Sequence, residues 1–290
     1  MDIEHLSNCL LCGSSELLTI DEKIHLSQCR KCGFIFDNPR PTIKEIKQFY
    51  SRPTQYNSWL DKESARNCLW WRRLRLVRRY GAGRKLLDVG AGIGQFLSFA
   101  KKYFEVSGTE ISESAVKIAK EKYGIDLFKD CFEEMRFQDR FDCITLFHVL
   151  EHVPNPVVTI QKCKELLAQN GVLIIAVPHD IYGIQSFIKR VCSFLNIGKY
   201  KQYGKYGLPK LVLDGSLPEI HLSHFTPKVL STFLTKKGFV IVDLTLDPYY
   251  VADGIKKVIH RVIFTGCYYM NLILKINIYP TFLIVAKLNK

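Results

Sequence analysis

The sequence predicts a doubly wound α/β domain with a parallel sheet, preceded by a small cysteine-rich ribbon. From Lys85 onward, short apolar segments alternate with segments of helical spacing, which is typical of a parallel sheet covered by helices on both faces. A glycine-rich turn follows the first apolar segment, at the place where such sheets bind ligands. Two Cys-x-x-Cys pairs within residues 1–42 indicate a separate metal-binding ribbon.

Composition limits the class of protein. The chain has 290 residues, of which 47% are hydrophobic, and this is enough to bury one substantial core with an appendage. No segment approaches the roughly 20 consecutive apolar residues that span a bilayer. The first residues lack a basic segment followed by an apolar one, so we expect no secretory signal and a cytoplasmic protein.

The formal net charge of +13 favours an anionic partner. Nucleic acid, an acidic membrane face and a phosphorylated small molecule all fit this charge. A basic surface that only contacts water fits it equally well.

The first predicted unit, residues 1–42, is a zinc ribbon. Its four cysteines, Cys9, Cys12, Cys29 and Cys32, follow the pattern C-x2-C-x16-C-x2-C. Four thiolates at this spacing can close a tetrahedron around zinc, and the glycine after each pair allows the tight turn. Such a site has no open coordination position. The expected zinc is therefore structural.

Residues 43–84 form the second predicted unit, a helical cap or linker. The segment RNCLWWRRLRLVRRYG carries six arginines among apolar and aromatic residues. Arginines beside aromatic rings can bind phosphates or stack on bases. A cap helix that shows its basic side to water is the simpler interpretation, and we expect it.

The third predicted unit, residues 85–290, contains the α/β alternation. The expected strands are 85–90, 105–111, 125–130, 141–149, 171–178, 240–246 and 281–289, and the expected helices are 94–104, 113–124, 156–171 and 226–239. Two segments interrupt the alternation: an irregular acceptor insert at 181–225 and a late insert at 251–278.

The glycine-rich turn reads Asp88-Val-Gly90-Ala-Gly92-Ile-Gly94. Its third glycine comes one residue too early for the dinucleotide fingerprint, and a carboxylate at Asp88 would repel a pyrophosphate. The turn instead suits a ligand that carries positive charge. S-adenosylmethionine has an ammonium and a sulfonium and no phosphate.

Acidic residues also close the next two strands. Glu110, followed by Ile111, is placed to accept hydrogen bonds from two ribose hydroxyls. Asp130 and Cys131 end the third strand, where the carboxylate can bind the adenine amino group. Because the carboxyl ends of parallel strands meet at one edge, these residues predict a single binding site.

These motifs resemble class I S-adenosylmethionine-dependent methyltransferases over roughly residues 85–290. The cysteine ribbon, FHVLEHVPNP and the segment His221-Leu-Ser-His224-Phe-Thr resemble a bacterial group that acts on sugars, glycans and natural products. The resemblance implies a Rossmann-like sheet of seven strands with the last strand antiparallel. It also implies methyl transfer to an oxygen or a carbon.

The segment FHVLEHVPNP contains His-x-x-Glu-His, a spacing used by some zinc peptidases. That use requires both histidines on one helix, whereas His148 closes a strand and the following prolines interrupt any helix. We expect Phe147 and His148 to contact the donor. Glu151 and His152 can act in catalysis or hold a divalent ion, as in some related methyltransferases. The alternative is that His148 and His152 are only hydrogen-bonded structural residues.

The resemblance implies His224 as the base, because a histidine before Phe-Ser/Thr is the usual proposed base in related sugar methyltransferases. We expect Glu151 to orient the His224 ring, with His221 beside it and His152 as the second candidate. The alternative is that His221 and His224 only cap the following helix.

The expected function is methyl transfer to a hydroxyl, or less readily a carbon, of a sugar, a glycan precursor or a related small metabolite. We expect the acceptor to be anionic. An RNA methyltransferase that uses the ribbon and the basic helix is the main alternative, and a ligand sensor without activity is another. Residues 255–275 mix basic and apolar side chains, which suits either a cover for the sheet or a helix at an acidic membrane.

Overall fold

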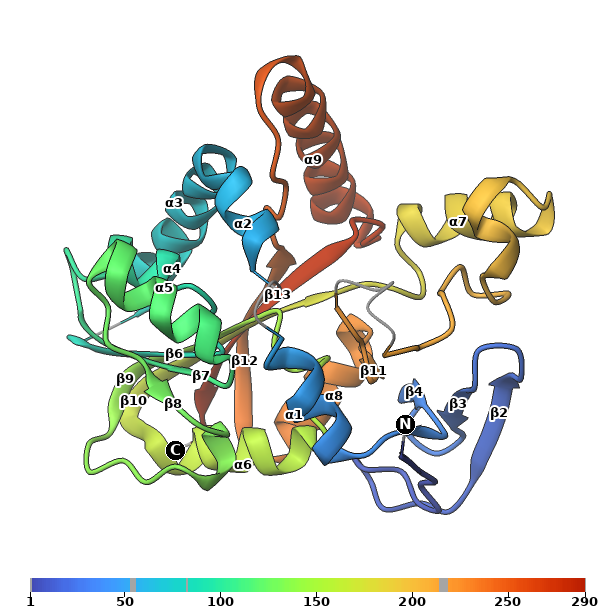
Figure 1. Ribbon diagram of the computed structural model, residues 1–290, viewed down its shortest axis with the longest axis horizontal. Helices are drawn as coiled ribbons and strands as arrows, with labels where there is room; N and C mark the ends of the chain where they lie inside the picture. The colour runs from blue at the N-terminus through green and yellow to red at the C-terminus, as the bar shows by residue number, and fades with distance from the viewer. Residues whose placement is uncertain (1, 53–55, 82, 214–218, 290) are drawn as a thin grey trace.

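The structure is a computed structural model that describes residues 2–52, 56–81, 83–213 and 219–289. Figure 1 shows a central twisted sheet with helices on both faces. The amino-terminal ribbon lies beside the sheet at the lower right, and two helices, α7 (Ile184–Phe194) and α9 (Gly254–Leu274), project from the upper side.

The central sheet has seven strands in the order β12-β13-β10-β9-β6-β7-β8. In chain order they are β6 (Lys85–Val89), β7 (Glu105–Glu110), β8 (Phe128–Lys129), β9 (Phe141–Phe147), β10 (Leu167–Pro178), β12 (Phe239–Leu246) and β13 (Thr281–Leu288). β13 pairs antiparallel with both β10 and β12, whereas the pairs among β6 to β10 are parallel. The predicted fold class is therefore confirmed.

Strand β8 is shorter than predicted. The apolar run at 125–130 suggested a six-residue strand, but only Phe128 and Lys129 pair, and they pair with β7 alone. An edge strand with one neighbour lacks the second ladder that would extend it.

Alternation along β10 builds a core on each face of the sheet. Leu173 and Ile175 face the side covered by α6 (Pro156–Leu166) and α8 (Pro227–Lys236). Ile174 and Ala176 face the other side, which α3 (Glu63–Tyr80), α4 (Gln95–Ala100) and α5 (Glu113–Tyr123) cover.

The predicted cap contains three helices, α1 (Ile43–Tyr50), α2 (Asn57–Asp61) and α3, while its residues 53–55 lie outside the described part of the chain. Its long helix α3 does not simply show its arginines to water. Arg66 and Arg73 are buried, because they share a helical face with Leu69 and Val77.

The ribbon consists of β2 (Leu17–Asp21), β3 (Leu26–Cys29) and β4 (Ile35–Asp37), with a separate pair formed by β1 (Ile3–Glu4) and β5 (Arg40–Pro41). A fourth strand, β11 (Ser223–His224), comes from the acceptor insert and pairs antiparallel with β4. Phe34 also packs against Phe225, with ring centroids 5.4 Å apart. The ribbon and the insert are thus joined through one sheet.

The two inserts contain more helix than predicted. The segment 181–225 was expected to be irregular, but it forms α7, the short helix η2 (Gly198–Gln202) and β11, while its residues 214–218 lie outside the described part. Apolar residues at 184, 187, 188, 191 and 194 supply the helical spacing. The late insert forms α9. Among the described residues, no helix is long and apolar enough to cross a membrane.

Candidate active site

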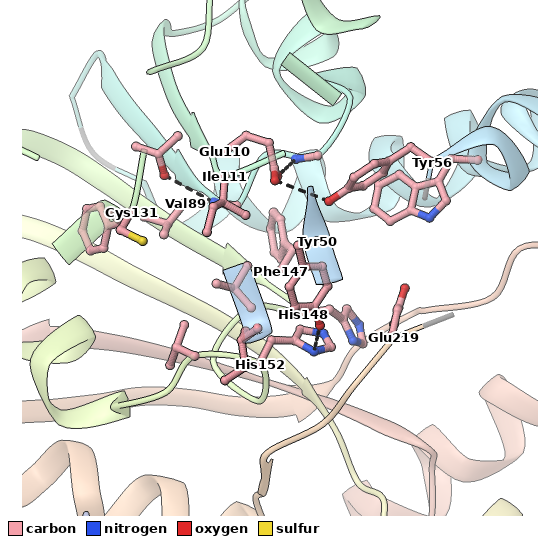
Figure 2. Close-up of a pocket in the computed structure, with 18 of the residues that line it drawn as sticks. Tyr50, Tyr56, Val89, Glu110, Ile111, Cys131, Phe147, His148, His152 and Glu219 are labelled. Atoms are coloured by element: carbon pink, nitrogen blue, oxygen red, sulfur yellow. Dashed lines mark hydrogen bonds between the residues drawn. The ribbon is translucent and has the colours of Figure 1, made fainter. Parts of the chain in front are cut away.

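A cavity of about 300 Å³ lies at the carboxyl edge of the sheet, beneath the cap (Figure 2). Its size falls at the lower end of the roughly 300–1,000 Å³ range of small-molecule sites. Nine of the predicted site residues line it: Gly90, Gly92, Glu110, Ile111, Asp130, Cys131, Phe147, His148 and His152. Five others do not, namely Asp88, Gly94, Glu151, His221 and His224.

The glycine turn divides into a lining part and a packing part. Gly90 and Gly92 have φ angles of 66° and 55° and form part of the cavity wall. A Cβ atom at Gly92 would lie 2.9 Å from the Trp59 ring of the cap. Gly94 instead starts α4, where a Cβ atom would lie 2.9 Å from the Ala119 side chain. Its role is therefore close packing and not contact with a ligand.

Asp88 does not face the cavity, which corrects the prediction that it contacts a positively charged ligand. Its side chain is buried within the sheet, where Oδ1 accepts a hydrogen bond from the Thr145 hydroxyl at 2.6 Å. Burial raises the pKa of Asp88 to about 7. Asp88 therefore has a structural role in the sheet, next to the glycine-rich turn.

Glu110 is held rigidly at the end of β7. Its Oε2 accepts a hydrogen bond from the Gly92 N–H at 2.8 Å, and its Oε1 accepts one from the Ser112 N–H at 2.9 Å. The Tyr56 hydroxyl also donates to Oε1, at 3.4 Å. Burial outweighs these bonds and raises the pKa of Glu110. The carboxylate thus links the turn, the strand end and the cap.

Asp130 and Cys131 line the cavity on the far side of Glu110, as Figure 2 shows for Cys131. Asp130 Oδ1 accepts a hydrogen bond from the Cys131 N–H at 2.7 Å, and the residue is exposed. Its other oxygen is free to meet a ligand amino group.

An ion pair between Arg73 of α3 and Asp247, which follows β12, joins the cap to the sheet. The Nε–Oδ1 distance is 3.1 Å and the Nη2–Oδ2 distance is 2.6 Å, and the side chains are 1% and 0% exposed. Burial by itself would raise the pKa of Asp247, but the charge of Arg73 lowers it to about 2. The guanidinium lies 4.5 Å from the centre of the Phe147 ring. Arg73 therefore forms part of the cavity wall with its charge already paired.

Arg66, two turns earlier on the same face of α3, differs from Arg73. It lines the cavity and is 9% exposed, its guanidinium lies 4.0 Å from the centre of the Trp59 ring, and no carboxylate of the described residues pairs with it. Its Nε is buried without a hydrogen-bond partner among those residues.

Burial lowers the pKa of Arg66, although Tyr249 and the charge of Glu219, both on the cavity wall, oppose this effect. A buried cation without a direct ion pair can bind an anionic group. Helical spacing with Leu69 and Val77 was the sequence signal that could have identified it.

His148 directly follows β9 and has a left-handed conformation, with φ of 59°. Its Nε2 lies 3.4 Å from Asp247 Oδ2, and its Nδ1 lies 3.3 Å from Glu151 Oε1. Burial lowers the pKa of His148, but the two carboxylates outweigh this effect and raise it. The ring carries a proton more readily than a free histidine does.

His152 faces the cavity and is electrically different from His148. Its Nδ1 donates a hydrogen bond to the Ile220 carbonyl at 2.5 Å, and the Tyr50 hydroxyl lies 2.9 Å from the same nitrogen. Because a carbonyl only accepts, Nδ1 carries the hydrogen and Nε2 keeps its lone pair. Burial lowers the pKa of His152. The ring is therefore neutral near pH 7 and able to accept a proton.

Glu151 lies behind His152 and is fully buried, with neither carboxylate oxygen hydrogen-bonded among the described residues. Burial opposes ionisation, but the adjacent histidines, His152 foremost, keep the pKa of Glu151 below its usual value. Ligand atoms of Glu151, His152 and His221 lie within 4.8 Å of one another. A buried carboxylate without a hydrogen bond, with the imidazoles of His152 and His221 nearby, fits a divalent ion.

His224 is not placed to act as the base. Its Nε2 lies 3.0 Å from Asp37 of the ribbon, and its Nδ1 lies 3.4 Å from Asp180, which follows β10. Burial lowers the pKa of His224, but these carboxylates raise it to about 9, so the ring is protonated near pH 7. Asp37 and Asp180 orient the ring, and Glu151, the expected partner, does not.

His221 shares Asp180 with His224. Its Nδ1 lies 2.6 Å from Asp180 Oδ2, and its ring centre lies 4.9 Å from that of His152. Burial lowers the pKa of His221, and the Asp180 charge raises it to about 9. His221 therefore belongs to the same charged cluster and touches the cavity only through His152.

The four ribbon cysteines come together as predicted. Cys9 and Cys32 have their sulfur atoms 3.5 Å apart, as do Cys12 and Cys29, and all four sulfur atoms lie within 4.8 Å of one another. Gly13 and Gly33 turn the chain after each pair with φ angles of 72° and 76°. The arrangement can hold a metal ion. Four cysteine ligands would leave that ion no open coordination position for a substrate.

A family profile described as "Methyltransferase domain" matches residues 57–244, more than half of the chain. The ubiquinone biosynthesis O-methyltransferase of Glaesserella parasuis is 34% identical over 106 residues, which cover 32% of this chain and 45% of that protein. The chain thus spans less than half the length of this relative.

Solved structures are similar in fold. A S-adenosylmethionine-dependent methyltransferase from Mesorhizobium loti has a TM-score of 0.51 at 18% identity, covering 75% of this chain and 97% of that chain. A S-adenosylmethionine-dependent methyltransferase from Thermotoga maritima, described as a possible histamine N-methyltransferase, also has a TM-score of 0.51, at 17% identity, covering 84% and 100%.

The charged cluster predicts how stability depends on pH. His221 and His224 have pKa values of about 9 in the folded protein against 6.5 for an ordinary histidine. Their stabilising contribution is therefore complete below about pH 6.5 and is lost as the pH rises through 9. We expect the free energy of unfolding, measured with urea, to fall across this range. His224→Asn should lower stability by roughly 3 kcal/mol near pH 7 and flatten the pH dependence above it.

The exposed His260 provides the matched control. His260→Asn should leave both the stability and its pH dependence unchanged. A wild-type curve that stays level between pH 7 and 9, or one that rises there, would contradict the assigned cluster.

Proposed function

The chain belongs to the methyltransferase-domain family, as its resemblance to S-adenosylmethionine-dependent methyltransferases predicted, and on this basis we propose that it methylates a hydroxyl group. The observation that carries the proposal is the neutral His152 ring, which faces the cavity with a free lone pair. Relatives named ubiquinone biosynthesis O-methyltransferase also favour oxygen as the methylated atom.

The cavity offers a complementary group for each part of S-adenosylmethionine. Glu110, fixed by two backbone N–H groups, is placed for the ribose hydroxyls, and Asp130 for the adenine amino group. Arg66, whose buried Nε has no hydrogen-bond partner among the described residues, supplies a cation for the carboxylate of the methionine part. Phe147 and His148 lie at the β9 end, where the sulfonium would meet the acceptor.

In the proposed reaction, the acceptor oxygen attacks the methyl carbon in line with the carbon–sulfur bond. That bond breaks, its electron pair stays on sulfur, and S-adenosylhomocysteine leaves. The hydroxyl proton passes to Nε2 of His152, and the Glu151 carboxylate, 3.7 Å from this nitrogen, stabilises the resulting imidazolium. Because the sulfonium is already reactive, positioning and proton removal are the main tasks of the protein.

A divalent ion held by Glu151, His152 and His221 is the second possibility for this position, favoured because neither Glu151 oxygen has a hydrogen bond among the described residues. When bound, such an ion would lower the pKa of the acceptor hydroxyl. His152 would then serve as a ligand instead of a base.

We propose a sugar, a glycan precursor or a related small metabolite as the acceptor. Tyr50, Tyr56 and Tyr249 line the cavity and give it flat aromatic surfaces suited to sugar faces, with hydroxyls for hydrogen bonding. The RNA alternative is less well supported, because Arg66 and Arg73 of the basic helix face inward and Arg72 donates to the Pro248 and Tyr250 carbonyls. Steeply salt-dependent RNA binding would favour it.

We also propose that the four ribbon cysteines bind one structural zinc. The sulfur atoms converge, and Cys9 and Cys29 are buried in the core that the ribbon shares with the sheet. The zinc would hold β4 in place, and with it Asp37, the ribbon's partner for His224.

Replacing Cys29 with serine should remove this zinc. Elemental analysis should find about one zinc per wild-type chain and none in Cys29→Ser. Cys192→Ser, on α7 and outside the cluster, is the matched control and should keep its zinc. Full zinc content in Cys29→Ser would place the metal elsewhere.

His152→Asn should lower turnover by roughly 10²–10⁴ while the affinity for S-adenosylhomocysteine stays near the wild-type value. Turnover is measured as S-adenosylhomocysteine release over a panel of nucleotide sugars. The folded His224→Asn variant should keep its rate within about tenfold, because His224 lies outside the cavity.

Two results would count against His152 as the base. One is a near-normal rate in His152→Asn at saturating acceptor. The other is loss of wild-type activity in EDTA with recovery on adding Mg²⁺ or Mn²⁺, which would assign His152 to a metal site.

A further inference from the structure

Two helices leave the core at the edge of the sheet that carries the cavity. α7 follows the carboxyl end of β10, and α9 lies between β12 and β13. The two inserts meet at their base, where the Ile184 N–H donates a hydrogen bond to the Ile278 carbonyl at 2.8 Å. Figure 1 shows both helices projecting beyond the body of the protein.

α9 exposes apolar side chains along its whole length. Of its 21 residues, Phe264 and Cys267 are its main apolar contacts with the body, through Tyr250 and Tyr279. Its exposed apolar residues are Ile255, Val258, Ile259, Val262, Ile263, Tyr268, Tyr269, Met270, Leu272, Ile273 and Leu274. Ile255 is 77% exposed and Ile273 is 73% exposed. A helix that only covered the sheet would bury such residues.

α7 has the same character on a shorter scale. Ile184, Phe187, Ile188, Val191 and Phe194 recur at helical spacing, and all of them are exposed. Phe194 is 85% exposed and Phe187 is 64% exposed. The apolar side of α7 therefore faces solvent and is not covered by any other part of the described chain.

Both helices carry basic residues and no acidic ones, although Asp253 caps the amino end of α9. Residues 181–213 and residues 254–290 each contain six lysines and arginines, and neither range contains an aspartate or a glutamate. Lys256 and Arg261 are exposed on α9 and pair with no carboxylate of the described residues. A partner that covers the apolar side chains must therefore also be compatible with the positive charges of the surrounding lysines and arginines.

We propose that α7 and α9 together form a surface that binds anionic phospholipid membranes. The apolar side chains would enter the boundary between headgroups and acyl chains, and the basic side chains would lie against the headgroups. Since neither helix is long and apolar enough to cross a bilayer, the helices would lie in its interface. This surface extends the single segment 255–275 that the sequence suggested, because α7 adds a second apolar helix.

A second copy of the chain is a poorer partner. Two such surfaces would bring together positive charges, because the two inserts, 181–225 and 251–278, contain ten lysines and arginines against three acidic residues. An anionic membrane supplies both the apolar phase and the opposite charge. The proposal does not depend on the proposed methyl transfer, because membrane binding is measured without an acceptor.

Flotation with vesicles tests the proposal directly. We expect the protein to bind vesicles of phosphatidylcholine mixed with phosphatidylglycerol roughly tenfold or more tightly than vesicles of phosphatidylcholine alone. Added salt should weaken this binding. The double variants Phe187→Ser/Phe194→Ser on α7 and Ile259→Ser/Val262→Ser on α9 should each reduce it by roughly tenfold or more.

Phe128→Ser is the matched control, since Phe128 is 54% exposed but lies on the edge strand β8. It should bind vesicles as the wild type does. Because the substituted side chains are exposed, the variants should keep the wild-type melting temperature and affinity for S-adenosylhomocysteine.

Three results would overturn the proposal. The first is absence of vesicle binding by the wild type. The second is equal vesicle binding by the wild type and both double variants. The third is a wild type that self-associates and does not bind vesicles, while both double variants are monomers. Light scattering on the same samples identifies the third result.

Discussion

The cavity that we propose for the methyl donor depends on the buried ion pair between Arg73 and Asp247. The sheet alone provides a row of strand ends, and a closed site requires the cap to be held over them. Arg73 reaches from α3 to the loop after β12, and both side chains are fully enclosed. A buried pair of this kind is specific in geometry, because breaking it would leave an uncompensated charge at a cost of roughly 3–5 kcal/mol. The same pair fixes neighbours on both sides, since Asp247 also lies beside His148 and the guanidinium packs on Phe147.

A second charged cluster plays the corresponding part on the acceptor side. His224 lies between Asp37 of the ribbon and Asp180 after β10, and so joins three segments that are distant in the sequence. His221 extends the cluster to the edge of His152. His224, the base that the sequence favoured, and His221 beside it therefore hold the insert and the ribbon together, whereas His152, the second candidate, faces the cavity. The contrast arises from the neighbours. His224 has two carboxylates within 3.4 Å, whereas His152 has a backbone carbonyl at 2.5 Å and its nearest carboxylate, that of Glu151, at 3.7 Å.

Much of this architecture could be predicted from local patterns. Alternating strands and helices predicted the sheet, and the position of Glu110 at a strand end predicted its place on the cavity wall. Asp88 also lies at a strand end, but the alternation of side chains turns it into the sheet toward Thr145. The burial of Arg66 and Arg73 could have been predicted, since they are seven residues apart on one helical face. The two-residue strand β11 could not have been predicted, because its pairing with β4 joins segments almost 190 residues apart and has no local signal.

Calorimetric titration with S-adenosylhomocysteine tests most directly whether the cap and the sheet form the donor site through Arg73. The wild type should bind about one molecule per chain, and Arg73→Met should weaken binding by roughly 10–100-fold, as expected for loss of a buried charge pair in the wall. Arg75→Met, on the exposed side of the same helix, should bind as the wild type does. Equal binding by Arg73→Met and the wild type, or no binding by the wild type, would contradict the assignment of this cavity to the methyl donor.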